Sequence, residues 1–335
     1  MTTIAVDAMG GDHAPHEIVH GAVLAAREFG VNVQLIGQEA LIRNELKKHY
    51  TELLPIEVIP AEDVIEMAEK QPANAVRKKP NSSIAVAMNQ VAIGKASGVV
   101  AAGSTGAATA AALFILKRVE GVERPCIAAV IPSRLKPVIL ADAGANVESD
   151  PKHIFQNAIM GTALSRALFK IDRPRVGLLN IGEEPGKGSA LVKEAYQLLS
   201  AELNLNFIGN VEGRDVPEGV CDVCACDGFV GNVFLKAAEG IGKMVTSMLR
   251  EELTRDVKSQ LGALLAKDSF YRLKKRLDYA EYGGAQLLGV NGVCVIAHGS
   301  SKHIAIKNAI RVAKDASDAN VIKLIENMVK NYVNK

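Results

Sequence analysis

The sequence predicts an α/β fold built on a doubly wound, mostly parallel sheet. Short apolar runs that suit buried strands alternate with helical stretches along the whole chain. Several of these strands lead directly into a glycine-rich loop and then a helix, as where Thr3–Asp7 is followed by the loop of residues 8–13. Strands and helices in alternation form parallel sheets covered by helices. We find no internal repeat or low-complexity linker, so we expect residues 1–335 to form a single domain.

The composition is that of a soluble globular protein. The chain has 335 residues, of which 48% are hydrophobic and 23% charged, and its formal net charge is +2. A charge this close to zero argues against a general nucleic-acid binder. The first residues enter a strand without a signal segment, and no apolar run is long enough to span a bilayer. We therefore expect a cytoplasmic protein.

Apolar runs bounded by turn residues predict the strands, and proline and glycine mark helix ends. Pro15 suits the first turn of a helix that Gly30 ends, and Pro151 begins a long helix that reaches about Phe169. Strands are expected at residues 3–7, 31–36, 56–59, 99–102, 138–140, 176–179, 220–226, 286–290 and 293–298. Further helices are expected at residues 39–49, 81–93, 107–117, from residue 230, at 245–282 and in the C-terminal tail.

Six loops at predicted strand ends share one chemical character, being rich in glycine or small residues with one or two polar groups. In open α/β sheets, ligands bind beyond the carboxyl ends of the strands. Glycines let the backbone approach a ligand closely, and helix starts offer unpaired N–H groups to an anion. The loops therefore predict a crevice suited to an anion and a polarised carbonyl. They are residues 7–12, 103–106, 142–146, 182–188, 227–232 and 298–301.

The loop at residues 182–188 nearly forms a P-loop, but it departs from the motif in two ways. It is one residue short before Gly186 and Lys187, and Gly188 stands where the magnesium-binding Ser or Thr should be. ATP binding is therefore disfavoured. The first strand is not followed by G-x-G-x-x-G, so the dinucleotide-binding fingerprint is missing too.

The cysteines at positions 221, 224 and 226 raise the possibility of a metal site, but their spacing argues against it. In a strand, Cys224 and Cys226 would share one face and Cys221 would take the other. No nearby fourth ligand completes a zinc tetrad. We expect these cysteines to fill the core, with neither a metal nor a cofactor bound to the protein.

Taken together, the strand-end motifs resemble the bacterial phosphate acyltransferase (PlsX) family from one end of the chain to the other. The departure is the cysteine-rich strand before Asp227, where the family usually has other apolar residues. The motifs lie at residues 7–12, 102–107, 142–146, 179–188, 227–240, 282–292 and 298–301.

This resemblance implies transfer of a long-chain acyl group from acyl carrier protein to inorganic phosphate. The acyl phosphate would feed a membrane glycerol-3-phosphate acyltransferase at the start of phospholipid synthesis. The fold of the family is similar to that of phosphotransacetylases and of isocitrate and isopropylmalate dehydrogenases, and its members are homodimers.

The reaction needs an anion site, donors for the tetrahedral oxyanion and a fate for the leaving thiolate, but no strong base. We assign Lys187 to phosphate or oxyanion charge, and Asn232 and His298 as oxyanion or leaving-group donors. Asp227 would orient Lys187 or one of those donors. Each residue also has a purely structural alternative. Lys187 would be a solvated lysine, Asp142 and Asp227 would cap helices, and His298 would be a packed core histidine. The candidate substrate-binding residues are Asp7, Gly10, Gly11, Ser104, Thr105, Gly106, Asp142, Asn146 and Gly228.

Residues 251–282 predict a projecting hairpin of two amphipathic helices. Leucines and valines recur there at helical spacing, and the second helix has a basic polar face that includes Arg272 and Arg276. Packing on the core or across a dimer is the commoner role of such a stripe. A basic amphipathic helix is also typical of anionic lipid surfaces. We expect a peripheral membrane contact through Leu261, Leu264 and Leu265.

Three other functions compete with this one. A small-acyl phosphotransacetylase that uses coenzyme A would have the same fold. A decarboxylating dehydrogenase would need metal-binding aspartates and substrate arginines that we do not find. A non-catalytic adaptor between acyl carrier protein and the membrane would not need so many intact strand-end loops.

Overall fold

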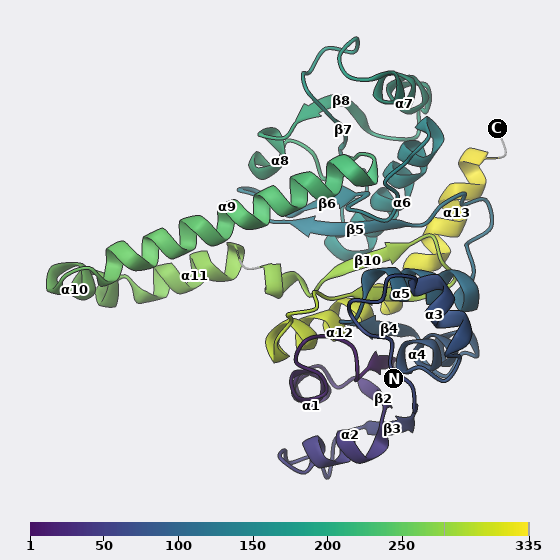
Figure 1. Cartoon of the computed structure of the whole chain (residues 1–335). Helices are drawn as coiled ribbons and strands as arrows, with labels where there is room; N and C mark the ends of the chain where they lie inside the picture. Colours follow the sequence, from purple (N-terminus) through teal and green to yellow (C-terminus); the bar gives the residue numbers. More distant parts are fainter. Residues whose placement is uncertain (278, 334–335) are drawn as a thin grey trace.

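The protein is organised around one mixed sheet with helices on both faces (Figure 1). Within residues 1–277 and 279–333, which the computed structural model describes, eleven strands are hydrogen-bonded in the order β3-β2-β1-β4-β11-β10-β5-β6-β9-β7-β8. They are β1 (Thr3–Asp7), β2 (Asn32–Gly37), β3 (Ile56–Pro60), β4 (Gly98–Ala101), β5 (Cys126–Ile131), β6 (Val138–Ala141), β7 (Val176–Asn180), β8 (Phe207–Glu212), β9 (Val223–Ala225), β10 (Ala285–Leu288) and β11 (Val293–Ile296).

Most neighbouring strands are parallel, which confirms the predicted fold class. Strands β3, β2, β1, β4 and β11 form one parallel block, and β6, β9, β7 and β8 form another. Between the blocks, β10 is antiparallel to β11 and β5, and β5 is antiparallel to β6. The two blocks are therefore joined by antiparallel pairs at the centre of the sheet.

The helices pack on the two faces of this sheet through two hydrophobic clusters. In β1, Ile4 and Val6 join the cluster beneath α1, α6, α12 and α13, whereas Ala5 joins the cluster beneath α4 and α5. This alternation follows from the period of two in a strand. The helices are α1 (His16–Phe29), α2 (Glu39–Leu46), α3 (Pro72–Lys78), α4 (Ser83–Ala92), α5 (Thr105–Ala111), α6 (Pro151–Phe169), α7 (Ala190–Ala201), α8 (Asp215–Glu218), α12 (His303–Asp318) and α13 (Val321–Val333).

The three clustered cysteines are all buried in the second of these clusters. Cys224 and Cys226 share a face, as the alternation predicts. The prediction that Cys221 takes the opposite face was wrong, because β9 begins only at Val223 and the strand geometry does not extend back to Cys221. Burial raises the pKa of the Cys226 thiol well above its ordinary value, so this cysteine stays a neutral core residue.

A helical arm projects from the sheet (Figure 1). It consists of α9 (Gly228–Thr254), α10 (Val257–Leu265) at its tip and α11 (Lys267–Leu277), which returns towards the sheet. Helix α9 has 27 residues and is therefore about 40 Å long. The projecting arm begins at Gly228, before the predicted hairpin of residues 251–282, and Leu253 belongs to its long first helix. Residue 278, inside the predicted hairpin, lies outside the described residues.

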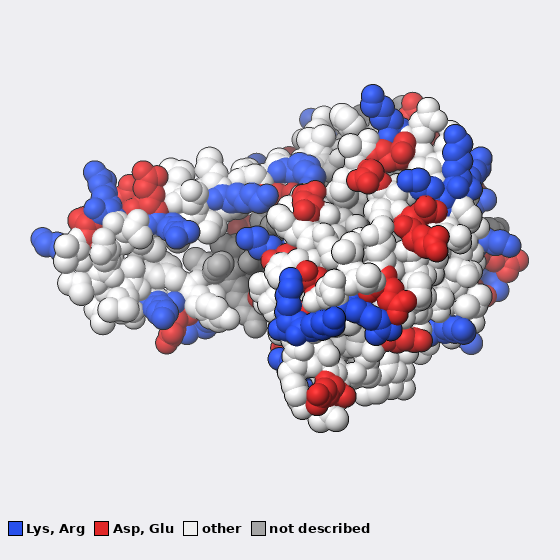
Figure 2. All heavy atoms as spheres, turned by 60° about the horizontal axis from the view of Figure 1, so that its bottom comes forward, with Lys and Arg blue, Asp and Glu red and all other residues white. Residues whose placement is uncertain are grey.

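Most of the described apolar side chains of the arm are exposed in the single chain. In α9 the buried residues are Gly228 and Gly231, and at the tip Leu265 is 90% exposed. Figure 2 shows uncharged surface over the arm between scattered charged side chains. None of the helices in the described part of the chain combines the length and the hydropathy needed to cross a bilayer.

Candidate functional site

The loops after β1, β4 and β11 meet at the carboxyl ends of three neighbouring strands. The N–H of Asp12 donates to the carbonyl oxygen of Gly299 at 2.9 Å. A Cβ atom on Gly10 would lie 2.8 Å from both the backbone nitrogen of Gly103 and the Oδ2 atom of Asp7. No larger residue fits at position 10 without moving the backbone. Three of the six predicted loops are thus packed into one group.

Asp7 lies buried beneath this loop group and does not face open solvent. Its Oδ1 atom accepts a hydrogen bond from the N–H of Met9 at 3.1 Å. Burial raises the pKa of Asp7, although hydrogen bonds from Ser83, Met9 and Gly10 act in the opposite direction. In this position the carboxyl group holds the turn of the loop.

A second loop group forms after β6, around the buried carboxylate of Asp142. The Oδ1 atom accepts hydrogen bonds from the N–H groups of Ile127, Gly144 and Ala145 at 2.9–3.0 Å. The Oδ2 atom accepts two from the backbone N–H and side-chain amide of Asn146, both at 2.9 Å. Burial is the first cause of the raised pKa of Asp142. Asp142 and Asn146 therefore fold the loop into a fixed shape.

Helix α9 begins directly against this second group. Asp227 caps the helix, because its Oδ1 atom accepts from the N–H groups of Phe229 and Val230 at 3.0 and 2.9 Å. The side chain of Asn232 then packs beside Gly144. A Cβ atom added at position 144 would lie 3.3 Å from the Cγ atom of Asn232. The structure therefore shows Asp227 as a helix cap, which was the structural alternative to its predicted role of orienting a donor.

A cavity of about 390 Å³ opens between the two loop groups. Thr105, His298 and Ser301 line it from the first group, and Gly144 and Asn232 line it from the second. The structure thus brings together three of the predicted site residues, Thr105, Asn232 and His298. The rest of the lining is largely apolar and includes Ile127, Ala129, Val130, Ala143, Leu235, Ile296, Ala297 and Ala305.

The other predicted residues are not among those that line this cavity. Ser104 caps α5 by accepting a hydrogen bond from Ala107 N–H, and Gly106 packs against Pro72 of α3. Lys187 lies in the exposed loop after β7, where its carbonyl accepts from the side-chain amide of Asn180 at 3.1 Å. The remaining positions shape the two loop groups; they are Asp7, Gly10, Gly11, Asp142, Asn146, Asp227 and Gly228.

The predicted site residues did not include two charged side chains and two hydroxyl groups of the cavity lining. Lys236 and Glu239 line the cavity from α9, the buried Ser301 lines it from the end of the loop at residues 298–301, and Tyr282 completes the set. The Nζ atom of Lys236 lies 3.0 Å from the Oε2 atom of Glu239. The spacing of positions 232, 236 and 239 places them on one helix face. This spacing could have indicated that Lys236 and Glu239 face the same site as Asn232.

His298 is held in one orientation by its own loop. Its Nδ1 atom accepts a hydrogen bond from the N–H of Ser300 at 3.2 Å and lies 2.9 Å from the Ser300 hydroxyl. Since a backbone N–H can only donate, the Nδ1 atom acts as an acceptor and the neutral ring carries its proton on Nε2. The Nε2–H group is then available as a donor.

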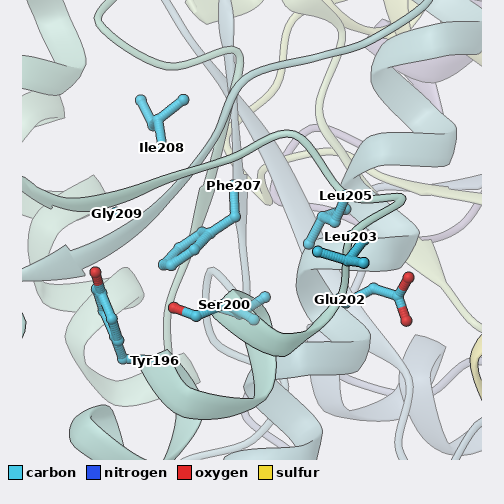
Figure 3. A pocket seen from close by; sticks show the side chains of 9 residues that line it. Tyr196, Ser200, Glu202, Leu203, Leu205, Phe207, Ile208 and Gly209 are labelled. Carbon is cyan, nitrogen blue, oxygen red and sulfur yellow. The ribbon is translucent and has the colours of Figure 1, made fainter.

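A second cavity of about 420 Å³ lies between α7 and the edge strand β8 (Figure 3). Its walls include Tyr196 and Phe207, whose rings meet edge to face with centroids 5.2 Å apart. None of the predicted site residues is among those that line it. The cavity between the loop groups is therefore the candidate functional site.

The protein has an α/β fold that is shared with phosphotransacetylases. A phosphotransacetylase from Streptococcus pyogenes superposes with a TM-score of 0.61 at 17% identity, covering 95% of this chain and 94% of that one. A 4-hydroxythreonine-4-phosphate dehydrogenase from Klebsiella pneumoniae gives 0.50 at 16% identity, covering 98% and 99%. At these identities the likeness concerns the fold alone.

Sequence relatives define the family more closely. A family model described as "Fatty acid synthesis protein" matches residues 2–324. The chain is 48% identical to a phosphate acyltransferase of Trichodesmium erythraeum, covering 97% of this chain and 95% of the relative. It is 49% identical to one of Gloeobacter violaceus, covering 96% and 95%. The chain belongs to the phosphate acyltransferase (PlsX) family, and it is an acyltransferase of lipid synthesis.

Proposed function

We propose that the protein transfers a long-chain fatty acyl group from acyl carrier protein to inorganic phosphate. The observation that carries this proposal is the cavity between the loop groups, which combines the polar side chains of Thr105, Asn232 and His298 with an extended apolar wall. A cavity of this kind suits a polar reacting centre attached to an apolar chain. The acyl phosphate would supply a membrane glycerol-3-phosphate acyltransferase in phospholipid synthesis.

In this reaction an oxygen of hydrogen phosphate attacks the thioester carbonyl carbon. A C–O bond forms, the C–S bond breaks, and the carrier sulfur leaves as a thiolate that takes up the proton of the remaining phosphate hydroxyl. Phosphate is already an anion near neutral pH, so the site needs to bind and orient it rather than to deprotonate it. Donors directed at the developing oxyanion then lower the barrier. The reaction requires neither a metal nor a nucleotide.

His298 and Asn232 are the donors that we assign to the reacting centre. The Nε2–H group of His298 is available because the Nδ1 atom is occupied by Ser300. It can donate to the oxyanion or to the leaving sulfur. The amide of Asn232 lines the same cavity from the opposite loop group. Thr105 adds a hydroxyl for phosphate, and Asp142 and Asp227 position the loop and helix on which Asn232 depends.

We further propose that the protein works as a homodimer in the cytoplasm and binds peripherally to the membrane through its arm. The support is the exposure of the arm in the single chain, where Leu261, Leu264 and Leu265 at the tip are all more than half exposed. A large apolar surface of this kind marks a contact with protein or lipid. A second copy would cover part of α9, and anionic lipid would receive the tip.

The test uses purified protein, inorganic phosphate and palmitoyl-acyl carrier protein, without added metal or nucleotide. We expect free carrier thiol and acyl phosphate in equal amounts. His298→Ala should lower turnover by about a hundredfold, as expected for a lost oxyanion donor. His298→Gln keeps an N–H donor and should lose less. Turnover only with acetyl-coenzyme A would favour a small-acyl phosphotransacetylase, and carrier binding without turnover would favour an adaptor.

A further inference from the structure

The cavity contains an ion pair that the proposed chemistry has not used. The Nζ atom of Lys236 lies 3.0 Å from the Oε2 atom of Glu239, one turn further along α9. The lysine side chain is 53% exposed, whereas the glutamate side chain is 18% exposed. Both residues line the cavity on the same helix face as Asn232. The pair is therefore open to a small ion that enters the cavity.

Lys236 is the single Lys or Arg among the described residues that line the cavity, and Glu239 is the single Asp or Glu. A phosphate dianion that enters a partly apolar cavity loses hydration, and this loss must be offset by positive charge and hydrogen-bond donors. The ammonium group of Lys236 offers both, with three donors on a flexible stem. Lys187 does not line the cavity, so it is not positioned to bind phosphate there.

We propose that Lys236 binds the attacking phosphate, and that Glu239 is a positioning residue that holds the ammonium group until phosphate displaces it. This inference rests on the proposed function and names the cation of its phosphate site. Lys236 stands one helical turn beyond Asn232. A phosphate bound at Lys236 would therefore lie beside the donor that we assign to the thioester oxygen, which brings the nucleophile and the carbonyl together.

Glu239 has two opposite effects on phosphate. It fixes the lysine side chain in the empty site, but its own negative charge competes with phosphate for the same ammonium group. Removing the charge while keeping the shape, as in Glu239→Gln, should therefore strengthen phosphate binding. Removing the lysine should weaken it and leave Glu239 as an uncompensated repulsive charge.

The test measures kcat and KM for phosphate with palmitoyl-acyl carrier protein as donor. Lys236→Ala should raise KM for phosphate by about tenfold or more, as expected for a lost charge-assisted contact. Lys236→Arg should restore part of the affinity, and Glu239→Gln should lower KM severalfold. Lys243→Ala, on the same helix but outside the cavity lining, is the matched control and should behave as wild type.

A second readout does not depend on turnover. Inorganic phosphate should raise the melting temperature of the wild type and of Lys243→Ala, because a ligand that binds the folded state stabilises it. Lys236→Ala should lose this rise. If Lys236→Ala keeps both the rise and a wild-type KM, or if Glu239→Gln raises KM, the proposal is wrong. Phosphate binding that depends on Lys236, without acyl transfer, would instead overturn the proposed function.

Discussion

The backbone N–H of Gly228 donates a hydrogen bond of 3.0 Å to the carbonyl oxygen of Asn146. This bond joins the first residue of the long helix α9 to the loop after β6. A Cβ atom at position 228 would lie 2.4 Å from the same carbonyl oxygen. Glycine is therefore required for the contact, and the position of Asn232 in the cavity depends on it.

Gly231→Ala tests this junction. The new Cβ atom would lie 1.8 Å from the carbonyl oxygen of Asp142, so the start of α9 must move away from the loop. We expect a loss of about 1–3 kcal/mol in the free energy of unfolding, measured with urea, and a lower kcat. Gly240→Ala is the control on the same helix, because a Cβ atom there would contact nothing within 4 Å outside the neighbouring helix backbone, and it should stabilise by about 0.5–1 kcal/mol. Equal stability of the Gly231 variant and the wild type would contradict the packing.

Asp142→Asn should destabilise the fold although it changes few atoms. The carboxylate accepts five hydrogen bonds, from Ile127, Gly144, Ala145 and twice from Asn146. An amide places an NH₂ group against N–H donors, so we expect a loss of about 2 kcal/mol or more in urea unfolding. Asp150→Asn is the control, because Asp150 caps α6 and asparagine caps a helix equally well. The two variants should differ clearly.

Three histidine rings stack on the face formed by α1, α12 and the chain after α2. The His20 ring lies between His49 and His303, with centroid distances of 4.8 and 4.2 Å. Burial, followed by repulsion from His303 and His49, lowers the pKa of His20. Burial, followed by repulsion from His16, lowers the pKa of His49. The charged groups around the stack are Glu17, Glu45, Arg27 and Lys48.

These pKa values predict how stability depends on pH. A lowered pKa in the folded state means that the unfolded chain binds more protons, so stability falls as pH drops through the ordinary histidine value of about 6.5. We expect the melting temperature to fall between about pH 7.5 and 5.5. His20→Phe keeps a ring without a charge and should flatten this dependence, whereas replacing the exposed His13 should not. A dependence that stays as steep in His20→Phe would refute the prediction.

Lys187→Ala and Asp227→Ala test the catalytic roles predicted from the sequence. The predicted roles require each change to lower kcat by about a hundredfold, with folding retained. We expect this loss for Asp227→Ala, because Asp227 caps the helix that carries Asn232, but not for Lys187→Ala, because Lys187 lies outside the cavity lining. Asp227→Ala should also cost about 0.5–2 kcal/mol of stability, because the carboxylate caps α9. Asp227→Asn keeps a cap and separates the two effects. Near-wild-type kcat in Lys187→Ala would leave that residue as a solvated loop lysine.

Changing both Leu264 and Leu265 to Glu tests the membrane contact of the arm. These side chains are exposed at the tip, and two added carboxylates oppose both apolar insertion and anionic lipid. Binding to liposomes that contain anionic lipid should be lost in co-sedimentation, while dimerisation and soluble turnover are kept. Leu203→Glu, at an equally exposed leucine far from the arm in the sequence, is the control. Dissociation of a dimer by the double change would show that the tip is a protein contact instead.

Much of the fold could be predicted because strand ends coincide with glycine and proline. The two strands that went unpredicted have weak strand character. Strand β5 contains two alanines, and β8 carries Gly209 and Asn210 at its centre. These residue types are depleted in strands, so only pairing with neighbours defines them. Strand β5 is also one of the antiparallel strands that join the two parallel blocks.

The site was harder to predict than the fold because it, too, depends on how distant strands pair. Thr105 and His298 line the same cavity as Asn232 only because the antiparallel strands set the two loop groups facing it. That arrangement has no local sequence signal. The sequence points to Lys187 as a phosphate-binding residue because it lies in a glycine-rich loop of the kind that binds phosphate. Lys236 lies inside an ordinary amphipathic helix and has no such signal. Position in space separates these lysines, and local sequence does not.

The length of α9 gives the arm a mechanical relation to the cavity. The helix is held at Gly228 and Gly231, so these residues act as the fulcrum of a lever. Asn232 lies about 1.5 Å along the axis from Gly231, and the far end of the helix at Thr254 lies about 35 Å from it. A sideways movement of the far end is therefore reduced more than about twentyfold at Asn232 if the helix stays rigid. Docking of the tip on a surface would then move Asn232, the proposed oxyanion donor, by fractions of an ångström, the scale on which acyl transfer is sensitive to geometry.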